Sequence, residues 1–565
     1  SLHDALPIFS QLAEARGYLA QAVHYLTRAV AVSERNLKLN LAVSSERQKL
    51  AYLATLTGEW DRALTLQARA AQLASDTGAP ASASALRLAL TLVLQRKGRA
   101  LDAAADSLAT LRKRADAAEQ ASFDQLRDAR AQLARLAFEP GPVSVAQQRE
   151  RDTLAERAEE LEAALSRRSE EFSSQTQHVT LATVQATIPS GGALLEFASY
   201  RPFKAQRKSA AASYDAPQYA AFVLRSQGEP QWINLGPVTV IDRAVQSWRQ
   251  ALRDPARTDA QRLGRAVYEL VFRPLRASLG DARQLLLSPD GALNLIPFAA
   301  LVDDEQRFLL ERYTCSYLTS GRDLLRLTLP RPPGGVPVIV AQPDYGDLPL
   351  TRRHGQTRFD TERLFFQPLP GTAREARALK ALLPEAHLLV KEQATEQALK
   401  QLHAPHVLHL ATHGFFLPRA NAENPLLRAG LALAGANQGQ AAGEDGLLTA
   451  LEAAGLNLWG TKLVALSACD TGVGEIKTGE GVYGLRRAFV LAGAESLVMS
   501  LWSVSDQATR EWMTAYYEAL QAGQARADAL RQVQMQMLRN AERQHPYYWA
   551  GFIQSGGWGT LTLQR

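Results

Sequence analysis

The stretch KLVALSACDTGVG, Lys462 to Gly474, determines which fold class the sequence predicts. Its first part, Leu463 to Ala468, is a largely apolar run, which is typical of a strand covered on both faces of a parallel sheet. The run ends at Cys469, and a polar, glycine-containing loop follows. A thiol in this position is either an inert core residue or a nucleophile at the rim of a sheet, and its surroundings must decide between the two.

Short apolar runs of the same kind alternate with helical segments after Thr180, which predicts an α/β region with a mainly parallel sheet. Thr372 and Thr395 are each expected to open a helix. The run RPPGG, Arg331 to Gly335, divides the region into a first part, 177–330, and a second part, 335–565. The other predicted strands are Ala193–Tyr200, Gln218–Ser226, Gln284–Asp290, Pro337–Pro343, His387–Lys391, His406–His413 and Ser496–Trp502.

The preceding segment is rich in Ala and Leu and has the period of helices. Similar motifs surround Gly17, Gly58 and Gly98, which are roughly 40 residues apart, and self-similarity at such a period predicts a helical solenoid over 9–135. The pattern resembles a tetratricopeptide array of the longer kind, and an ordinary Ala-rich bundle is the alternative. Because such arrays offer a concave surface to protein segments, we expect this part to bind a protein partner.

Two shorter segments flank this array. Residues 136–176 are charged and helical in period, which predicts a connecting helix, with a coiled-coil dimer as the alternative. The first residues, SLHDALPI (1–8), look like a translated sequencing adapter and are left out of the fold prediction. The natural protein is therefore expected to be longer at this end.

The composition narrows the possible classes of function. The chain has 565 residues, a net charge of +6 and two cysteines. Charges of both signs are interspersed, so neither a nucleic-acid footprint nor a basic membrane anchor is predicted. No run has the length and apolarity of a transmembrane helix. Two cysteines cannot form a disulfide framework, which predicts a reducing, cytoplasmic compartment, and nothing in the sequence indicates the oligomeric state.

His413 and Cys469 are the predicted reactive pair. The run HVLHLATHGFF carries His413, followed by Gly414, to the end of a predicted strand, as KLVALSACDTG carries Cys469. Functional groups gather beyond the carboxyl ends of parallel strands, so the two side chains share one rim if the strands are neighbours. An imidazole can take the proton of the thiol, and the N–H groups of Cys469 and Gly414 can stabilise an oxyanion. This chemistry needs no cofactor and no metal.

A series of motifs resembles the CHAT family, which comprises caspase-like, separase-related cysteine peptidase domains found behind tetratricopeptide repeats in bacteria. The likeness runs from about Leu263 to the end of the sequence. The motifs are LSPDGALNLIPFAALV (287–302), LERYTCSYLTS (310–320), LPGTAREARAL (369–379), LHLATHGFF (408–416), LSACDTGVG (466–474), GEGVYGLRRAFVLAGAESLVMSLWSVSD (479–506) and HPYYWAGFI (545–553).

This resemblance assigns roles to particular residues. It implies that His413 is the general base, that Cys469 is the nucleophile, and that the main-chain N–H groups of Gly414 and Cys469 form the oxyanion hole. Family members usually have Glu after the cysteine, where this chain has Asp470, so the acidity is kept. The intact dyad argues against a pseudoenzyme.

The substrate preference is open. SLWSVSD (500–506) resembles a separase segment in which an acidic residue receives a P1 arginine, which makes Asp506, together with Asp470, a substrate-pocket residue. The alternative is that Asp506 only favours the dipole of the helix that follows it.

Two other motifs predict no ligand site. The glycines of GEGVYG (479–484) match a dinucleotide fingerprint but do not directly follow a strand, so they predict an entry from a loop into a helix. The cluster His403, His406, His409 and His413 lacks the cysteines, the carboxylates and the spacing of a zinc site, and His409 is expected to be a hydrogen-bonded core residue.

The sequence therefore predicts a cysteine endopeptidase that cleaves a specific protein substrate. Its caspase-like α/β region follows a helical-repeat array, which is expected to bind a substrate or a protein activator and so control cleavage. The alternative is a non-catalytic scaffold that assembles a signalling complex. Cys315 has no reactive neighbour in the sequence pattern and is predicted to be structural.

Overall fold

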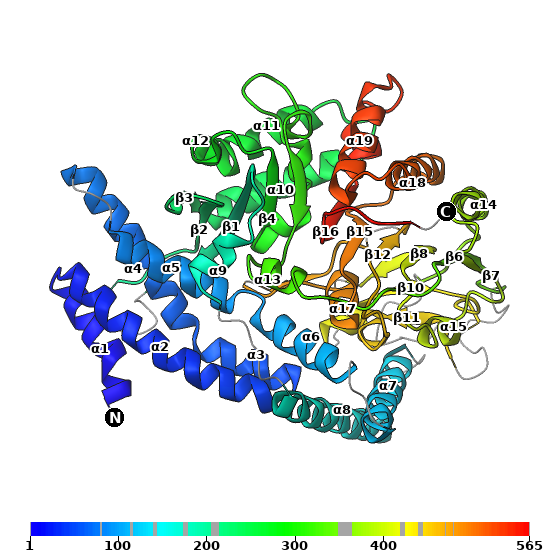
Figure 1. The fold of residues 1–565 in the computed structure, drawn as a ribbon, viewed down its shortest axis with the longest axis horizontal. Helices are drawn as coiled ribbons and strands as arrows, with labels where there is room; N and C mark the ends of the chain where they lie inside the picture. The colour runs from blue at the N-terminus through cyan, green and yellow to red at the C-terminus, as the bar shows by residue number, and fades with distance from the viewer. Residues whose placement is uncertain are drawn as a thin grey trace.

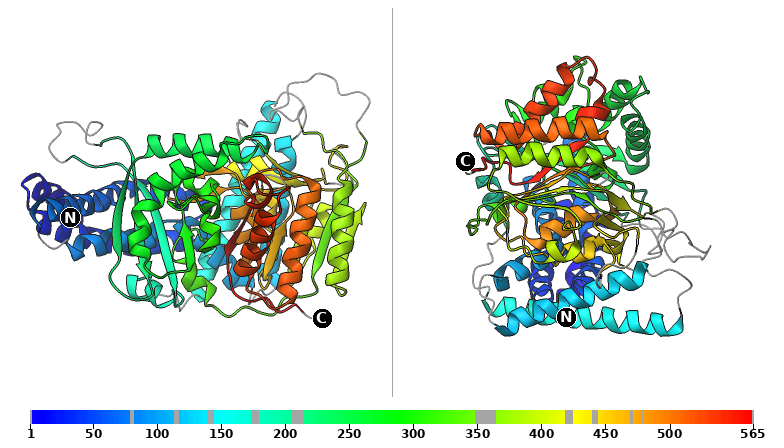
Figure 2. Two further views of the ribbon diagram at one scale, coloured as in Figure 1. Left: turned by 90° about the horizontal axis from the view of Figure 1, so that it is seen from above. Right: turned by 90° about the vertical axis from the view of Figure 1, so that its right-hand side faces the viewer.

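The computed structural model describes residues 2–78, 82–112, 117–138, 144–172, 179–204, 214–347, 364–417, 424–438, 444–468, 471–477 and 479–563. An N-terminal array of helices is followed by a sheet that carries helices on both faces, as predicted (Figure 1). Figure 2 shows the sheet as the middle layer of the molecule, with the array against one face.

The array consists of helices α1 to α8. Consecutive helices pack as pairs, with α1 on α2, α4 on α5 and α7 on α8. Gly17 joins α1 to α2 and Gly98 joins α5 to α6, with positive φ angles of 79° and 65°, a conformation that glycine adopts without strain. Gly58, the glycine of the other similar motif, lies in the first turn of α4, and the break between α3 and α4 falls two residues earlier, at Leu56. The bounds are α1 Leu2–Ala15, α2 Leu19–Val43, α3 Glu46–Thr55, α4 Thr57–Thr77, α5 Ala83–Arg96, α6 Arg99–Arg112, α7 Ala117–Phe138 and α8 Val145–Phe172.

The main sheet has eleven strands in the order β3-β2-β1-β4-β5-β16-β15-β12-β8-β6-β7. From β1 to β7 in this order neighbouring strands are parallel, except for the antiparallel pair β16 and β15. The group β1, β4, β5 and β16 therefore runs opposite to the group β15, β12, β8, β6 and β7. Strand β16 therefore joins the strands of residues 177–330 to those of residues 335–565 in one sheet. Its strands are β1 Gly192–Tyr200, β2 Gln218–Arg225, β3 Gln231–Pro237, β4 Gln284–Ser288, β5 Thr314–Tyr317, β6 Val338–Pro343, β7 His387–Lys391, β8 Val407–Ala411, β12 Leu463–Leu466, β15 Ser496–Ser500 and β16 Phe552–Gly556.

Two small sheets follow β8 and β12, the strands that precede His413 and Cys469 in the sequence. Strands β9 Gly414–Phe416, β10 Ala429–Ala432 and β11 Leu447–Thr449 form an antiparallel sheet directly after β8. Strands β13 Glu475–Lys477 and β14 Gly481–Tyr483 form a hairpin a few residues after β12. The GEGVYG segment, predicted to lead from a loop into a helix, contains the turn and second strand of this hairpin, and the helix α17, Leu485–Ala492, begins directly after it.

Helices of the α/β region cover both faces of the sheet (Figures 1 and 2). Thr395 caps α15 as predicted, since its side chain accepts a hydrogen bond from the N–H of Ala398. Thr372 does not cap α14, which begins two residues earlier at Pro370, because proline suits the first helical position. The helices are α9 Leu181–Ala186, α10 Val238–Leu252, α11 Ala260–Val271, α12 Arg276–Leu279, α13 Asp323–Leu327, α14 Pro370–Leu382, α15 Glu396–Lys400, α16 Ala450–Ala453, α17 Leu485–Ala492, α18 Asp506–Gln521, α19 Arg526–Arg539 and α20 Pro546–Trp549.

The array shares a hydrophobic core with the sheet. Apolar residues of α4 and α5, among them Leu64 and Leu90, pack against residues of β1, β2 and β4, such as Leu194. Trp60 of α4 also donates a hydrogen bond from Nε1 to the carbonyl oxygen of Ser199, at 2.9 Å. Part of the array therefore serves as a helical layer of the α/β region.

A buried lysine reinforces this junction. Lys97, which follows α5, is 1 % exposed, and its Nζ lies 2.8 Å from Oε1 of Glu196 in β1. The same ammonium donates to the carbonyl oxygens of Phe197 and Ser288, both at 2.7 Å, and to Oγ of Ser288 at 2.8 Å. Four acceptors around one charge compensate for its removal from water.

Candidate active site

The strands that carry the predicted reactive residues are neighbours. β8 and β12 pair in parallel, with Leu410 opposite Leu466, so their carboxyl ends meet at one rim of the sheet. His413 follows the end of β8 by two positions. Cys469 and Asp470 lie outside the described residues. The adjacency on which the predicted dyad depends is therefore present, and the dyad itself stays a prediction.

His413 is half-buried and held by one polar contact and two aromatic rings. Its Nε2 lies 2.8 Å from the carbonyl oxygen of Gln367. The rings of Tyr345 and Phe366 flank the imidazole at centroid distances of 5.3 and 5.6 Å. Because a carbonyl oxygen only accepts, Nε2 carries a proton, and in the neutral ring the free lone pair is on Nδ1. The imidazole is thus oriented with Nδ1 as its basic atom.

The N–H of Gly414 points away from the neighbouring strand. Ala432 donates its N–H to the carbonyl oxygen of His413 at 2.9 Å, and Gly414 is opposite Leu431. This pattern makes Gly414 and Leu431 a non-hydrogen-bonded pair, in which both N–H groups point outward. Since β9 is an edge strand of its sheet, the Gly414 N–H is directed away from β10 and is available to another acceptor.

The residues on both sides of positions 469 and 470 are fixed by Ser500 at the end of β15. Oγ of Ser500 donates to the carbonyl oxygen of Ala468 at 2.6 Å, and its N–H donates to Oγ1 of Thr471 at 3.1 Å. Gly472 donates its N–H to the carbonyl oxygen of Ser500 at 2.7 Å. A Cβ on Gly472 would lie only 2.9 Å from that oxygen, so a glycine permits this close approach.

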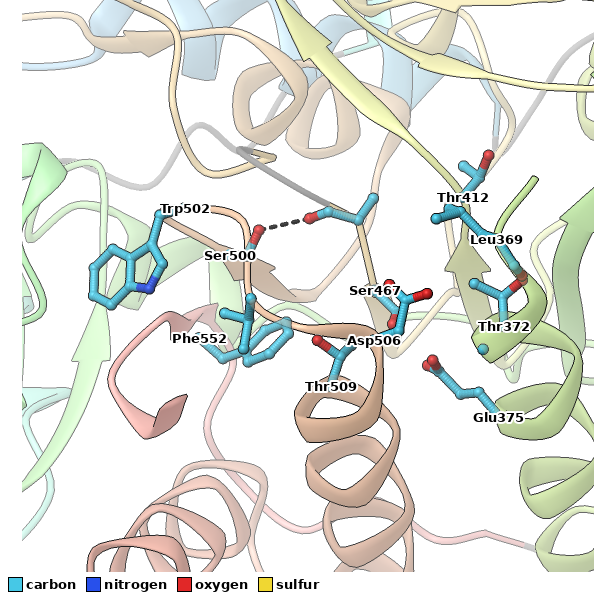
Figure 3. Close-up of a pocket in the computed structure, with 13 residues that line it drawn as sticks. Leu369, Thr372, Glu375, Thr412, Ser467, Ser500, Trp502, Asp506, Thr509 and Phe552 are labelled. Carbon is cyan, nitrogen blue, oxygen red and sulfur yellow. Dashed lines mark hydrogen bonds between the residues drawn. The ribbon is translucent and has the colours of Figure 1, made fainter. Parts of the chain in front are cut away.

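A cavity opens at the same rim (Figure 3). It encloses about 430 Å³, including its open mouth, between the ends of β8, β12 and β15 and the first turns of α14 and α18. Thr412, next to His413, and Ala468, next to Cys469, both line it. Among the described residues its lining is Leu369, Gly371, Thr372, Glu375, Thr412, Ser467, Ala468, Ser500, Trp502, Val504, Asp506, Thr509 and Phe552.

Two carboxylates give this cavity its charge. Asp506 enters from the N-terminus of α18 and packs against Gly371, while Glu375 enters from α14 (Figure 3). Asp506 thus lines a cavity and also begins a helix, and its predicted contact with substrate stays a prediction. The buried hydroxyl Oγ of Ser467 has no hydrogen-bond partner among the described residues. No cationic side chain is among the lining residues.

His409 lies beneath this cavity as a core residue. It is fully buried, with Nε2 2.9 Å from Oε1 of Glu375 and Nδ1 3.3 Å from the hydroxyl of Tyr517. Burial raises the pKa of Tyr517 well above its ordinary value, and the nearby Glu375 adds to this shift. The tyrosine therefore stays protonated and donates to Nδ1, which leaves Nε2–H to donate to the carboxylate of Glu375.

The other two histidines of the cluster, His403 and His406, each contact a different backbone carbonyl oxygen. Nδ1 of His403 lies 2.7 Å from the carbonyl oxygen of Gln401, and Nε2 of His406 lies 2.9 Å from that of Thr562. Burial lowers the pKa of His406.

One group of three carboxylates in the described residues has the spacing of metal ligands: Glu396, Glu444 and Glu452. The ammonium of Lys400 lies among them, at 3.1, 2.7 and 2.8 Å respectively. The lysine supplies the positive charge that a metal would bring, so Lys400 and the three carboxylates form an ion-pair cluster.

The second cysteine differs from a reactive thiol in its surroundings. Cys315 of β5 is buried, and burial raises the pKa of its thiol to about 12. A thiol with so high a pKa is protonated near neutral pH and is a weak nucleophile.

Sequence reasoning did not identify Gln367, Glu375 or Ser467 as site residues. Gln367 acts through its backbone, so its side-chain type carried no signal. Glu375 lies within LPGTAREARAL, which has the pattern of an amphipathic helix. Ser467 interrupts the apolar run before Cys469, and this interruption was the one available signal.

Comparison with known proteins identifies the family of the α/β region. Residues 261–557 match the model of the CHAT domain. Tetratricopeptide repeat protein 28 from Homo sapiens is 26% identical over 332 residues, and the Mus musculus protein is 25% identical over the same length. The match covers 52% of this chain but only 13% of each of these longer relatives.

Two solved structures align with this chain at low sequence identity. The Saccharomyces cerevisiae separase-securin complex aligns with 95% of this chain and 40% of that chain, at a TM-score of 0.44 and 9% identity. The Arg-specific cysteine proteinase gingipain R aligns with 57% of this chain and 75% of that chain, at a TM-score of 0.31 and 10% identity.

Among the described residues, no helix is long and apolar enough to cross a membrane. Since the family model covers more than half of the sequence, the chain belongs to the CHAT-domain family and carries tetratricopeptide-type helices before that domain.

Proposed function

We propose that the chain is a cysteine endopeptidase in which Cys469 is the nucleophile and His413 the general base. The observation that carries this proposal is the position of His413 at the end of β8, beside β12, with its Nε2 occupied by the carbonyl of Gln367. An imidazole held in this way has Nδ1 free to accept a proton at the rim to which β12 leads.

In the proposed reaction, Nδ1 of His413 takes the proton of the Cys469 thiol, and the sulfur attacks the carbonyl carbon of the scissile peptide bond. The N–H groups of Gly414 and Cys469 stabilise the oxyanion. The imidazolium then gives its proton to the leaving amine as the C–N bond breaks, which leaves a thioester. Water, deprotonated by His413, attacks the thioester, and the thiol and the carboxylic acid product are released.

We propose further that the cavity beside the dyad binds a basic P1 side chain. It lies between the residue before His413 and the residue before Cys469, where the P1 side chain of a bound substrate would enter. Asp506 at its wall and Glu375 at its floor supply negative charge, and Ser467 supplies an unpartnered hydroxyl. Asp470, which follows Cys469 in the sequence, is a further candidate for contact with substrate.

The helical array is proposed to regulate the site through the β13–β14 hairpin, which begins six residues after Cys469. The N–H of Gly98, between α5 and α6, donates to the carbonyl oxygen of Gly479 in the hairpin turn at 2.7 Å. Arg487 of α17 donates from Nε and Nη2 to Oε1 of Glu46 in α3, at 2.9 and 2.6 Å. A protein bound to the array would therefore act on a segment that is continuous with the nucleophile.

The dyad is tested with a thiol-reactive peptidyl probe added to the full chain and to Cys469→Ala, His413→Ala and Cys315→Ala variants. Cys469→Ala should abolish labelling, and His413→Ala should slow it by about 10²- to 10⁴-fold, the usual contribution of a general base. Cys315→Ala is the matched control and should label like the wild type. Equal labelling of all four proteins would refute the proposed dyad. If the wild-type chain is not labelled even with a protein partner bound, the result would favour the alternative function, a non-catalytic scaffold.

The pocket is tested with probes that carry P1 arginine or P1 norleucine. Asp506→Asn and Glu375→Gln should each reduce the preference for arginine by about 10- to 100-fold, because a hydrogen bond to a charged group contributes about 1.5–3 kcal/mol. Glu511→Gln makes the same charge change on an exposed part of α18 and should leave the preference unaltered. An arginine preference that survives both pocket variants would contradict the assignment without affecting the dyad.

The coupling to the array is tested with Arg487→Met, which removes the ion pair to Glu46. We expect slower labelling of Cys469 by the same probe, because α17, which directly follows the hairpin, loses its ion pair with the array. Unchanged labelling would show that the array and the nucleophile are independent.

A further inference from the structure

A second cavity lies inside the array, away from the candidate active site. Its empty space, with the open solvent at its mouth included, amounts to about 390 Å³ among α3, α6, α7 and α8, and α17 borders one side with Leu491. Figure 1 shows α6 between α17 and the array helices α3 and α8. Its lining residues are Glu46, Lys49, Ala104, Ser107, Leu108, Leu126, Arg130, Glu162, Leu165, Ser166 and Leu491.

Lys49 is a buried charge in this lining, and the carboxylates of Glu162 and Glu46 act on it only from beyond ion-pair distance, where they raise its pKa against the effect of burial. Its side chain is 2 % exposed, and its Nζ donates to Oγ of Ser166 at 3.0 Å. No carboxylate of the described residues lies within ion-pair distance of this ammonium. Burial lowers the pKa of Lys49 to about 8, so the ammonium still predominates at neutral pH. An ammonium has three N–H donors, and one hydrogen bond leaves two of them to face the cavity.

The carboxylates of the cavity are already engaged by other groups. Oε1 of Glu162 accepts from Nη2 of Arg130 at 2.9 Å, and Oε2 accepts from the N–H of Glu46 at 3.1 Å. The carboxylate of Glu46 is paired with Arg487, and its pKa is lowered by that pairing against the effect of burial. Nε of Arg130, a side chain that is 6 % exposed, has no hydrogen-bond partner among the described residues. The hydrogen-bond donors of the cavity that have no acceptor among the described residues therefore belong to the cations Lys49 and Arg130.

The rest of the lining is aliphatic. Ala104, Leu108, Leu126, Leu165 and Leu491 surround the charged end with methyl and methylene groups. An inorganic anion would satisfy Lys49 and Arg130 but leave this surface uncovered. A ligand that fits both parts has one negative charge and a short apolar body.

We propose that this cavity is a binding site for a small aliphatic carboxylate. The carboxylate would accept hydrogen bonds from Nζ of Lys49 and Nε of Arg130, and the hydrocarbon would lie against the leucines. Such a ligand gives the ammonium of Lys49, which no carboxylate of the described residues contacts directly, a direct ionic partner, and this is the reason for its selectivity over neutral and cationic molecules of the same shape.

The test is calorimetric titration of the full chain with hexanoate, hexanol and hexylamine. Hexanoate should bind with one molecule per chain, and hexanol and hexylamine should bind at least 10-fold more weakly. Saturable binding of all three with equal affinity, or no saturable binding of hexanoate, would overturn the proposal.

Two variants locate the site. Lys49→Met keeps the length of the side chain and removes the charge, and should weaken hexanoate binding at least 10-fold, whereas the exposed Lys38→Met should not change it. Ala104→Leu fills the apolar part without altering charge, and should also weaken binding at least 10-fold. Because removal of an unpaired buried charge does not destabilise a fold, Lys49→Met should unfold at the wild-type temperature or above it. Hexanoate binding that Lys49→Met and Ala104→Leu both retain would refute the site, and the titration does not depend on peptidase activity.

Discussion

Replacement of Lys97 by methionine tests whether the helical array and the sheet form one cooperative structure. The substitution keeps an unbranched side chain of similar length and removes the ammonium. The carboxylate of Glu196, fully buried, then loses its counter-charge, although it still accepts hydrogen bonds from Oγ of Ser288 at 2.6 Å and from the N–H of Gly321 at 2.8 Å. The carbonyl oxygens of Phe197 and Ser288 lose a donor at the same time.

The expected cost follows from these contacts. Removal of one partner from a buried ion pair costs about 3–5 kcal/mol, because an uncompensated charge stays in the interior. Replacing both partners, as in Lys97→Met combined with Glu196→Gln, removes that charge and should recover about 2 kcal/mol or more of the loss. The exposed pair Arg87 and Glu229 also links the array to the α/β region, at 2.6 Å, and Arg87→Met should cost less than about 1 kcal/mol.

Hydrogen exchange of peptides from β1 and β4, together with urea denaturation, measures the effect. Lys97→Met should reduce protection of these strands by about 10²- to 10⁴-fold, which is the exchange equivalent of the expected free energy. The reasoning is refuted if Lys97→Met costs no more than Arg87→Met, or if the double variant is as unstable as Lys97→Met alone.

Three further predictions concern the hairpin, a turn and the thiols. Burial raises the pKa of Glu480 to about 7 from 4.5, so the folded chain loses stability as the pH rises between these values. In urea denaturation, the difference in the free energy of unfolding between Glu480→Gln and the wild type should therefore shift in favour of the variant across this interval. The shift should be on the order of 3 kcal/mol and should stay constant at higher pH. Gly98→Ala should lower the free energy of unfolding by about 2 kcal/mol or more, because an added Cβ would lie 2.6 Å from a side chain across the junction, whereas Gly17→Ala, with a similar φ and open space, should cost about 1 kcal/mol. A chromogenic disulfide reagent should titrate one fast thiol in the folded chain, that of Cys469, and reach Cys315 only after unfolding, because burial raises the pKa of Cys315 to about 12; two fast thiols would contradict this.

The sequence predicted the strands that are fully covered on both faces. β8, β12 and β15 are short, apolar and bounded by polar loops, so their positions follow from local pattern alone. The predicted strands around His413 and Cys469 are longer than the observed ones, because the chain leaves the sheet at Ala411 and Leu466, before the reactive residues. This early departure is what allows the residues that follow to form a rim.

The features that sequence reasoning missed depend on long-range pairing. Strands β9 to β11 have three or four residues each and gain their stability from one another, so no single segment shows a strand pattern. Glu375 becomes a pocket residue because α14 lies next to α18, a proximity that the helical pattern around it does not encode. The hydrogen bond between His413 and Gln367 involves a backbone carbonyl, which every residue type offers.

The place of β16 has a consequence for how the chain folds as it is synthesised. The strands from β1 to β5 and the strands from β6 to β15 meet only through this segment, and it emerges after all of them. Until residues 552–556 appear, both halves of the sheet present an unpaired edge, which is a site for wrong pairing with another chain. The candidate active site lies in the later half, so its completion coincides with closure of the whole sheet.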